Sequence, residues 1–173
     1  PTIAEIQNGL FSKNLIITKS SQNEKLSHLS ALVNIEVGPN FRMRKIYEVE
    51  KKLRSNRLRV LIAFPMMYEV SQSILKIMSD VYTACDEIDF IIRKHPLLKV
   101  DVASGERNVT QDSNHGVYQT LSEVDVLIGS STSLCMDACC LGISVITIRD
   151  LGTICHNTIP LEIRDIFASE ATN

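Results

Sequence analysis

The chain has 173 residues, of which 45% are hydrophobic and 22% charged, a composition typical of a globular domain with one sizeable core. Its formal net charge is −2 and 5% of its residues are aromatic, so it lacks the basic surface and stacking side chains typical of nucleic-acid-binding proteins. No apolar run approaches the roughly 20 residues needed to span a bilayer. The five cysteines include no CxxC pair, which argues against a disulfide framework or a zinc site and favours a reduced, cytoplasmic setting.

The first half of the chain alternates short apolar runs with amphipathic stretches. The apolar runs predict strands over residues 15–18, 34–38, 59–65 and 89–95. Helices are predicted between them, over residues 24–32, 42–54 and 68–84. The last of these helices is the best defined, because Val70, Ile74 and Val81 recur at helical spacing.

The second half continues this alternation after a polar stretch, residues 99–114, in which Val100, Val102 and Val109 suggest a short edge strand. Helices are predicted over residues 115–121, 134–141 and 160–167, and strands over residues 124–128 and 145–148. Gly129 opens a turn of hydroxyl residues after the first of these strands. The helix over 134–141 carries three cysteines, which we expect to pack against the sheet as small apolar residues.

This order of elements predicts one Rossmann-like α/β domain, an open parallel sheet with helices on both faces. We expect the domain to cover residues 1–173, with a core at about 14–150 and a C-terminal tail at 151–173. Because the carboxyl ends of parallel strands share one edge, the turns that follow the predicted strands are expected to line one rim of the sheet.

Two turns on that rim carry residue types that bind phosphate. Arg93, Lys94 and His95 bring cationic side chains to the end of one strand. Residues 129–133 precede a helix start, where free N–H groups attract anions. This turn has neither the GxGxxG pattern nor a Walker lysine. The alternative interpretation is that its hydroxyl groups only cap the helix, which is a common arrangement.

Four motifs, in this order, resemble the C-terminal nucleotide-binding half of GT-B glycosyltransferases. They are a Gly38-Pro39 turn, a strand ending at Pro65, the run Arg93-Lys94-His95-Pro96, and Thr132-Ser133 followed by Asp137 and Gly142. The enzymes they resemble make surface polysaccharides and teichoic acids, and include the CDP-glycerol glycerophosphotransferases. The chain departs from the family pattern at Arg93, Thr132, Asp137 and Ser144, which leaves the identity of the donor open.

The resemblance implies a role for the residues of these motifs. His95 is expected to be the catalytic residue, which contacts the donor phosphates or assists the leaving phosphate. The hydroxyl turn is expected to bind the diphosphate and Asp137 a hydroxyl group of the donor. The donor would be a nucleotide-activated sugar or a CDP-polyol, with no further cofactor and no metal ion. The implied substrate-binding residues are Arg93, Lys94, Ser131, Thr132, Ser133 and Asp137.

A GT-B enzyme holds its active site between two domains, and this chain is expected to supply one of them. The segment before residue 15 is too short for the acceptor-binding half, so we expect that N-terminal domain, and any peripheral membrane association through it, outside these residues. The isolated chain is then expected to be inactive. Two other functions fit the same architecture: a UDP-GlcNAc 2-epimerase-like domain, and a non-catalytic Rossmann-like domain that binds a nucleotide or a protein.

Overall fold

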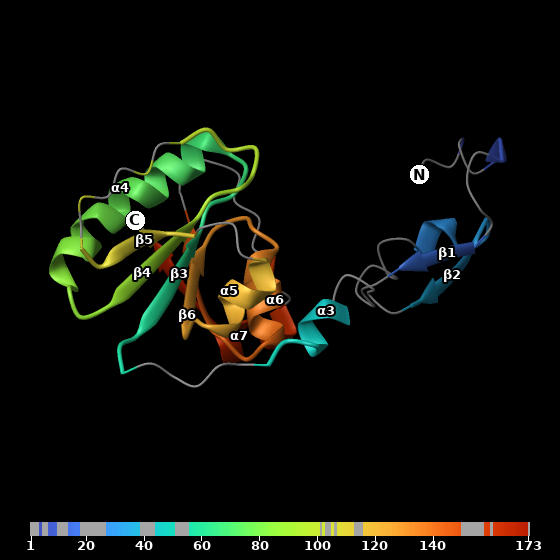
Figure 1. Cartoon of the computed structure of the whole chain (residues 1–173). Helices are drawn as coiled ribbons and strands as arrows, with labels where there is room; N and C mark the ends of the chain where they lie inside the picture. Colours follow the sequence, from blue (N-terminus) through green and yellow to red (C-terminus); the bar gives the residue numbers. More distant parts are fainter. Residues whose placement is uncertain are drawn as a thin grey trace. The chain divides into compact units, whose positions relative to one another are not determined.

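The chain, in a computed structural model, divides into two compact units, Pro1–Arg44 and Lys45–Asn173 (Figure 1). The residues described are 4, 7–9, 14–17, 27–38, 44–50, 56–100, 102, 105, 107–112, 116–149, 158–159 and 161–172. Each unit has its own sheet and its own cluster of buried apolar side chains.

The first unit contains a two-stranded parallel sheet. Strand β1 (Asn14–Ile17) pairs with β2 (Asn34–Val37), and the 3-10 helix η1 (Ser27–Leu29) lies between them in sequence. We expected these strands in the main sheet, and that prediction is wrong, because they pair with each other. Asn34 and Glu36 alternate along β2 and are exposed, whereas a strand inside a parallel sheet is apolar on both faces.

Two predicted helices are shorter than expected within the described residues. The stretch predicted as a helix over residues 24–32 forms the single turn η1, and residues 24–26 lie outside the described part. Ser30 Oγ donates a hydrogen bond of 2.6 Å to the Ser27 carbonyl, which competes with helical backbone bonding. Of the helix predicted over residues 42–54, the structure describes one turn, α3 (Arg44–Tyr47).

The second unit is built on a six-stranded parallel sheet in the order β5-β4-β3-β6-β7-β8. Counted from β3, this is the order 3-2-1-4-5-6 of a doubly wound sheet. The predicted Rossmann-like α/β fold is therefore confirmed. The strands are β3 (Arg59–Ala63), β4 (Asp89–Arg93), β5 (Val109–Gln111), β6 (Val126–Gly129), β7 (Ser144–Arg149) and β8 (Ala168–Thr172). The helices are α4 (Tyr68–Ala84), α5 (Val117–Ser122), α6 (Leu134–Cys140) and α7 (Leu161–Phe167).

Helices cover both faces of this sheet, as predicted (Figure 1). Along β3, Val60 and Ile62 pack on the side of α4, whereas Leu61 and Ala63 pack on the side of α5, α6 and α7. Both faces of β3 are thus buried, which explains its continuous apolar run. The longest described helix, α4, has 17 residues, and none of the described helices meets the length and hydropathy required to cross a bilayer.

The strands at the two edges of the sheet were the least visible in the sequence. β5 contains Val109, but Val100, expected in the same strand, is instead buried in the core beneath α4. β8 adds a strand within the stretch that we predicted as a tail, so the sheet extends past residue 150 to Thr172. Its sequence, Ala-Ser-Glu-Ala-Thr, is short and polar and has no apolar alternation that would predict a strand.

Candidate functional site

The strand order of the sheet reverses between β3 and β6. Strands β4 and β5 extend it on one side of this pair, and β7 and β8 extend it on the other. Ligands of doubly wound sheets bind outside the carboxyl ends of the strands at such a switch point. Two turns lie there: Phe64 to Met67 after β3, and Ser130 to Ser133 after β6.

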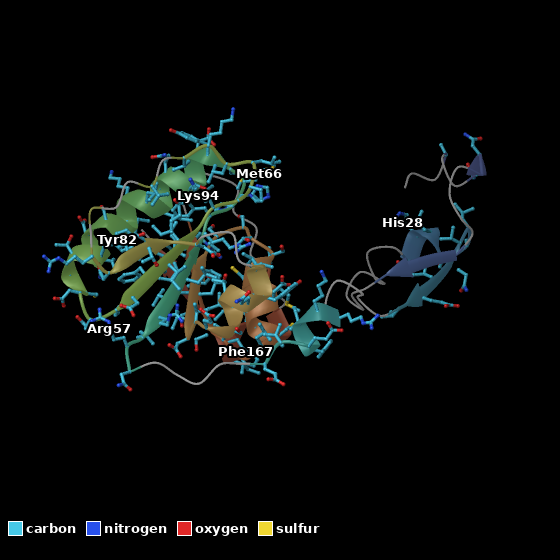
Figure 2. All side chains as sticks on the ribbon, in the orientation of Figure 1. His28, Arg57, Met66, Tyr82, Lys94 and Phe167 are labelled. Carbon is cyan, nitrogen blue, oxygen red and sulfur yellow. The ribbon has the colours of Figure 1, made fainter. Side chains whose placement is uncertain are left out.

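The turn after β3 presents apolar side chains to solvent at the switch point. Met66 is 60% exposed and Tyr68, the first residue of α4, is 53% exposed. The buried Ser71 side chain stabilises this turn. Its hydroxyl donates hydrogen bonds to the carbonyl oxygens of Pro65, at 3.2 Å, and of Met67, at 3.0 Å. Figure 2 shows Met66 and Lys94 at the same end of the sheet and Arg57 at the other. Sequence reasoning had not included this apolar surface in the site.

The turn after β6 is held tightly against the strand. A Cβ on Gly129 would lie 3.0 Å from Thr132 Cγ2 and 3.2 Å from Cys135 Sγ, so a side chain here would require these neighbours to move by a few tenths of an ångström. Ser131 adopts a left-handed backbone conformation, with φ at 50°, which costs a residue other than glycine about 1 kcal/mol. Strained backbone of this kind is common where a turn is shaped for a ligand.

The hydroxyl groups of this turn do not share one role. The Leu134 N–H donates to Thr132 Oγ1 at 3.4 Å, so Thr132 partly fulfils the capping role that was the alternative interpretation. The Thr132 carbonyl accepts a hydrogen bond of 2.8 Å from Thr158 Oγ1. Ser133, at the N-cap of α6, is exposed and its side chain makes no capping bond.

Asp137 lies in the first turn of α6 but does not face solvent. Its side chain belongs to the buried polar residues, at 2% exposure, and α6 itself is seven residues long. A carboxylate in this position is favoured by the partial positive charge of the helix start. The predicted contact between Asp137 and a donor hydroxyl group stays a prediction, and it requires the local structure to open.

A pocket of about 500 Å³ opens at the carboxyl ends of β4 and β5. Arg93 forms an ion pair with Asp112, whose side chain is 4% exposed and also accepts a hydrogen bond of 3.0 Å from Thr120 Oγ1. Lys94 Nζ donates to the Val100 carbonyl at 3.1 Å. The described lining residues are Arg93, Lys94, His95, Pro96, Leu98, Gln111 and Asp112. Both cations are thus held in place at the pocket by the protein itself.

His95 differs from these two cations in how its ring is held. The Leu97 N–H donates to His95 Nδ1 at 3.3 Å, which makes Nδ1 an acceptor. The hydrogen of the neutral imidazole is therefore assigned to Nε2. His95 is partly exposed in the pocket, so Nε2–H is a hydrogen-bond donor that a ligand oxygen can meet.

The structure brings Arg93, Lys94 and His95 together, while the hydroxyl turn lies at another strand end. Among the described lining residues of the pocket, none comes from Ser131, Thr132, Ser133 or Asp137. β4 and β6 lie on opposite sides of β3, which separates the two strand ends by about 10 Å. That both groups contact one ligand stays a prediction. Sequence reasoning missed Asp112 and Thr120, because the polar stretch around Asp112 has no periodic pattern.

Two of the three cysteines of α6, Cys135 and Cys139, pack against the sheet as predicted, whereas Cys140 is exposed, so the prediction is wrong for that residue. Burial raises the pKa of Cys135 to about 12 and that of Cys139 to about 11, so both thiols stay protonated at neutral pH. Both residues belong to the core between α6 and the sheet. Within the described ranges, no three His, Cys, Asp or Glu side chains gather as metal ligands.

No protein-family model and no curated protein sequence matches the chain. Solved structures do match it. The wall teichoic acid polymerase TagF superimposes with a TM-score of 0.55 at 16% identity, covering 91% of this chain and 46% of that protein. A variant of that polymerase gives a TM-score of 0.50 at 18% identity, covering 78% of this chain and 39% of the other. KpsC of Thermosulfurimonas dismutans, a beta Kdo 2,7 transferase, gives a TM-score of 0.45 at 11% identity, covering 83% of this chain and 44% of the other.

The chain therefore spans less than half the length of the polymerase that it matches. At such low identity the likeness shows the fold alone. It agrees with the Rossmann-like fold that the resemblance of the four sequence motifs implied. The chain is similar, over nearly all its length, to one half of a wall teichoic acid polymerase, with which it shares a Rossmann-like fold.

Proposed function

We propose that the chain is the donor-nucleotide-binding domain of a glycosyltransferase or polyol-phosphate transferase of cell-surface polysaccharide synthesis. The observation that carries the proposal is the pocket of Arg93, Lys94 and His95 at the carboxyl edge of the sheet, one strand from the switch point. The likeness of the fold to a teichoic acid polymerase supports it. The donor, a nucleotide-activated sugar or a CDP-polyol, would bind across the ends of β4, β3 and β6.

The chemistry of this edge suits a nucleotide diphosphate. His95 Nε2–H would donate to a phosphate oxygen, and Lys94 and Arg93 would add positive charge beside it. The hydroxyl groups and N–H groups of residues 131–133 would meet the other end of the diphosphate. Met66 and Tyr68 offer an apolar surface between these two groups, which suits the face of a nucleobase.

The reaction would be displacement at an anomeric carbon or at phosphorus, with the nucleotide as leaving group. His95 would donate a hydrogen bond to the phosphate oxygen on which negative charge grows, and this bond strengthens in the transition state. The acceptor would come from a second domain of the same protein, and peripheral membrane association would occur through that domain. We propose a cytoplasmic location, because the donor and the reduced cysteines both fit that compartment.

Nucleotide binding to the chain tests this proposal. Titration calorimetry with CDP, CMP and UDP is expected to give binding for at least one nucleotide. His95→Ala should weaken it about tenfold to a hundredfold, since a charge-assisted hydrogen bond contributes roughly 1.5–3 kcal/mol. Thr132→Ala should weaken it less, because the backbone N–H donors of the turn remain.

His28→Ala is the matched control, because His28 is an exposed histidine of the first unit. It should leave nucleotide affinity unchanged. Unchanged affinity in His95→Ala, with the fold intact by circular dichroism, would contradict the role of His95. Absence of binding by all three nucleotides would instead favour a domain that binds a protein partner.

A further inference from the structure

The loop that carries His95 is short and is anchored in the core. It comprises residues 94–100, which follow β4, and its residues Leu98 and Val100 are buried beneath α4. The Leu98 N–H donates to the His95 carbonyl at 2.9 Å, whereas Leu97 between them is 74% exposed. The loop therefore turns outward at Leu97 and is fixed at its far end by the core.

Lys94 closes this loop. Its Nζ donates to the carbonyl of Val100, six residues further along the chain, at 3.1 Å. Val100 lies in no helix or strand and is 3% exposed, so its carbonyl needs a hydrogen-bond partner within the protein. A ligand that drew the ammonium away would break this bond, which costs free energy at a partly buried carbonyl. The ammonium of Lys94 is thus better placed to hold the loop than to contact a ligand.

The closed loop determines how the His95 ring is held. The Leu97 N–H that donates to His95 Nδ1, at 3.3 Å, belongs to the same loop as the ring, so the two meet only in the closed arrangement. This bond places the hydrogen of the neutral imidazole on Nε2. If the loop opens, the bond is lost and the hydrogen can reside on either nitrogen. The form with its hydrogen on Nδ1 has no donor at Nε2 for a ligand oxygen.

We propose that Lys94 is a positioning residue for His95, which holds the loop closed and so keeps the imidazole hydrogen on Nε2. The contribution of this donor to ligand binding rests on the function proposed above, whereas the closure of the loop does not. In this arrangement Lys94 contributes to nucleotide affinity through His95, and its positive charge is secondary.

The first test is the tautomer of His95 in the ligand-free chain. It is measured by nitrogen nuclear magnetic resonance of the imidazole at about pH 8.5, where an unperturbed histidine is neutral. The original chain is expected to show the Nε2–H form alone. Lys94→Met keeps the length of the side chain but removes the ammonium, so it should give a mixture of both tautomers.

Lys99→Met is the matched control for charge, because Lys99 is an exposed lysine of the same loop. It should leave the tautomer of His95 unchanged.

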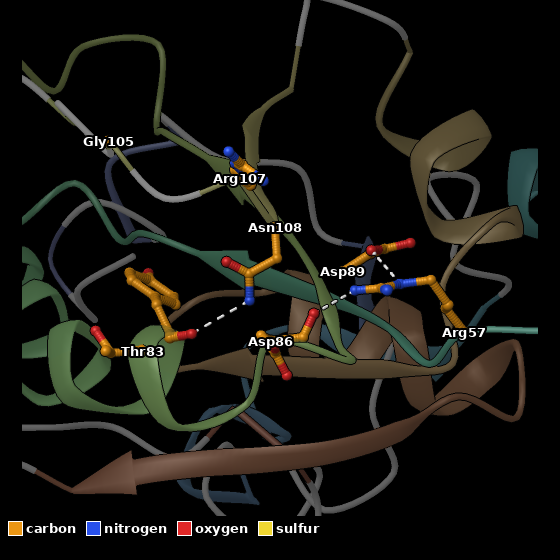
Figure 3. Close-up of a pocket in the computed structure, with 8 residues that line it drawn as sticks. Arg57, Thr83, Asp86, Asp89, Gly105, Arg107 and Asn108 are labelled. Atoms are coloured by element: carbon orange, nitrogen blue, oxygen red, sulfur yellow. Dashed lines mark hydrogen bonds and ion pairs between the residues drawn. The ribbon is translucent and has the colours of Figure 1, made fainter.

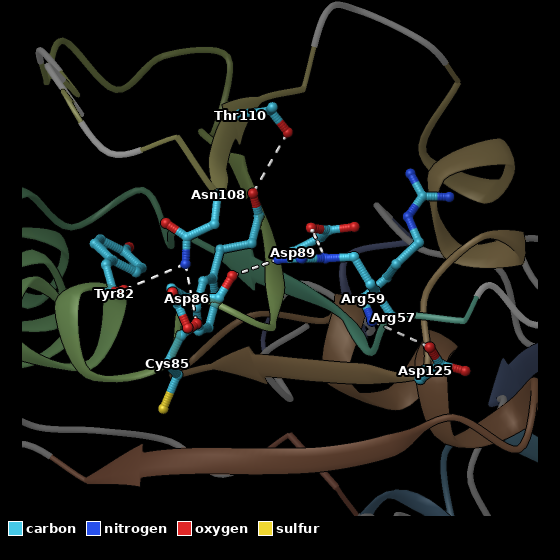
Figure 4. Close-up of polar contacts among 10 residues, drawn as sticks. Arg57, Arg59, Tyr82, Cys85, Asp86, Asp89, Asn108, Thr110 and Asp125 are labelled. Carbon is cyan, nitrogen blue, oxygen red and sulfur yellow. Dashed lines mark hydrogen bonds and ion pairs between the residues drawn. The ribbon is translucent and has the colours of Figure 1, made fainter.

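Arg57→Met is the matched control for stability, because it removes structural contacts at the opposite edge of the sheet. Arg57 donates to the Asp86 carbonyl and forms an ion pair of 2.8 Å with Asp89 (Figure 3). Asn108 Nδ2 donates to two further carbonyls at the end of α4, at 3.2 and 3.0 Å (Figure 4). Because these bonds remain, Arg57→Met should lower the Tm without unfolding the chain, and should also leave the tautomer of His95 unchanged.

The second test is nucleotide affinity, measured by calorimetry with whichever of CDP, CMP and UDP binds best. Lys94→Met should weaken binding about threefold to tenfold, since a mobile His95 must be ordered when the ligand binds. In the His95→Ala background the same change should have little effect, because its route through His95 is gone. A charge that acted directly on the phosphates would instead weaken binding equally in both backgrounds.

Two results would overturn the inference: Lys94→Met keeps a single Nε2–H tautomer, or it weakens nucleotide binding equally with and without His95. If the original chain binds no nucleotide, the proposed function fails, and the tautomer measurement alone decides whether Lys94 positions His95.

Discussion

At the scale of single residues, the proposed nucleotide pocket depends on a charge pair that the sequence did not reveal. Arg93 ends β4 and Asp112 follows β5, and the neighbouring strands bring the two side chains into contact. Asp112 is almost fully buried, and the hydroxyl of Thr120 satisfies a further acceptor position on its carboxylate. Arg93 therefore has two tasks, to neutralise a buried carboxylate and to place positive charge beside His95.

Replacing Arg93 separates these tasks. Arg93→Met leaves the Asp112 carboxylate buried without its cation, so we expect the free energy of unfolding in urea to fall by about 3 kcal/mol. Arg93→Lys keeps the charge but loses the planar guanidinium, and should recover part of the loss. If Arg93→Met unfolds at the same urea concentration as the original chain, the ion pair with Asp112 does not stabilise the fold. If nucleotide affinity falls in the same variant, Arg93 contributes to ligand binding only.

At the scale of elements, the unit formed by β6, the hydroxyl turn and α6 is fixed by close packing. Gly129 ends β6, and Thr132 and Cys135 lie against its Cα. This contact limits how closely α6 approaches the sheet, and Ser131 in the same turn has a left-handed backbone conformation. The position of the hydroxyl groups at the switch point thus follows from the absence of a side chain at residue 129.

Gly129→Ala tests that dependence. The added methyl carbon would lie 3.0 Å from Thr132 Cγ2, closer than ordinary van der Waals contact, so we expect a loss of about 1–3 kcal/mol in stability, together with a shift of the turn. Gly116→Ala is the control, because a Cβ at Gly116 meets no atom within 4 Å and its Tm should change little. Equal melting temperatures for the two variants in calorimetry would show that the turn tolerates a side chain at Gly129.

At the scale of the whole molecule, the chain consists of two units of very different size. The first unit buries Leu29 and Val33 around a two-stranded sheet, whereas the second has a core on each face of six strands. An isolated two-stranded sheet is at most marginally stable in water. Most of the cooperative unfolding of the chain should therefore come from the second unit.

A fragment from Lys45 to the C-terminus tests this division. We expect it to fold, with a Tm within a few degrees of the whole chain, because both large cores lie inside it. Its nucleotide affinity should equal that of the whole chain, since every proposed site residue lies in the second unit. A fragment that is unfolded by circular dichroism would show that the first unit is part of the same cooperative structure.

The sequence by itself determined the doubly wound class and most of the central elements of the sheet. β3 and β4 are buried on both faces, so each is a continuous apolar run, and α4 is amphipathic over 17 residues. The local spacing of apolar residues was therefore enough to predict all three elements. For the same reason the sequence predicted that Arg93, Lys94 and His95 stand together at a strand end. The N-cap position of Ser133 also followed from local rules, as Gly129 and the hydroxyl residues mark a turn before a helix.

Only the tertiary structure decided which strands pair and which side chains meet. β1 and β2 look like sheet strands locally, yet they form a separate sheet, since strand pairing depends on the surface each strand can bury. β8 has a polar sequence and joins the sheet because β7 offers an open edge. The Arg93–Asp112 ion pair, the burial of Asp137 and the Arg57–Asp89 ion pair join residues distant in sequence, so their contacts exist only once the sheet order brings the elements together.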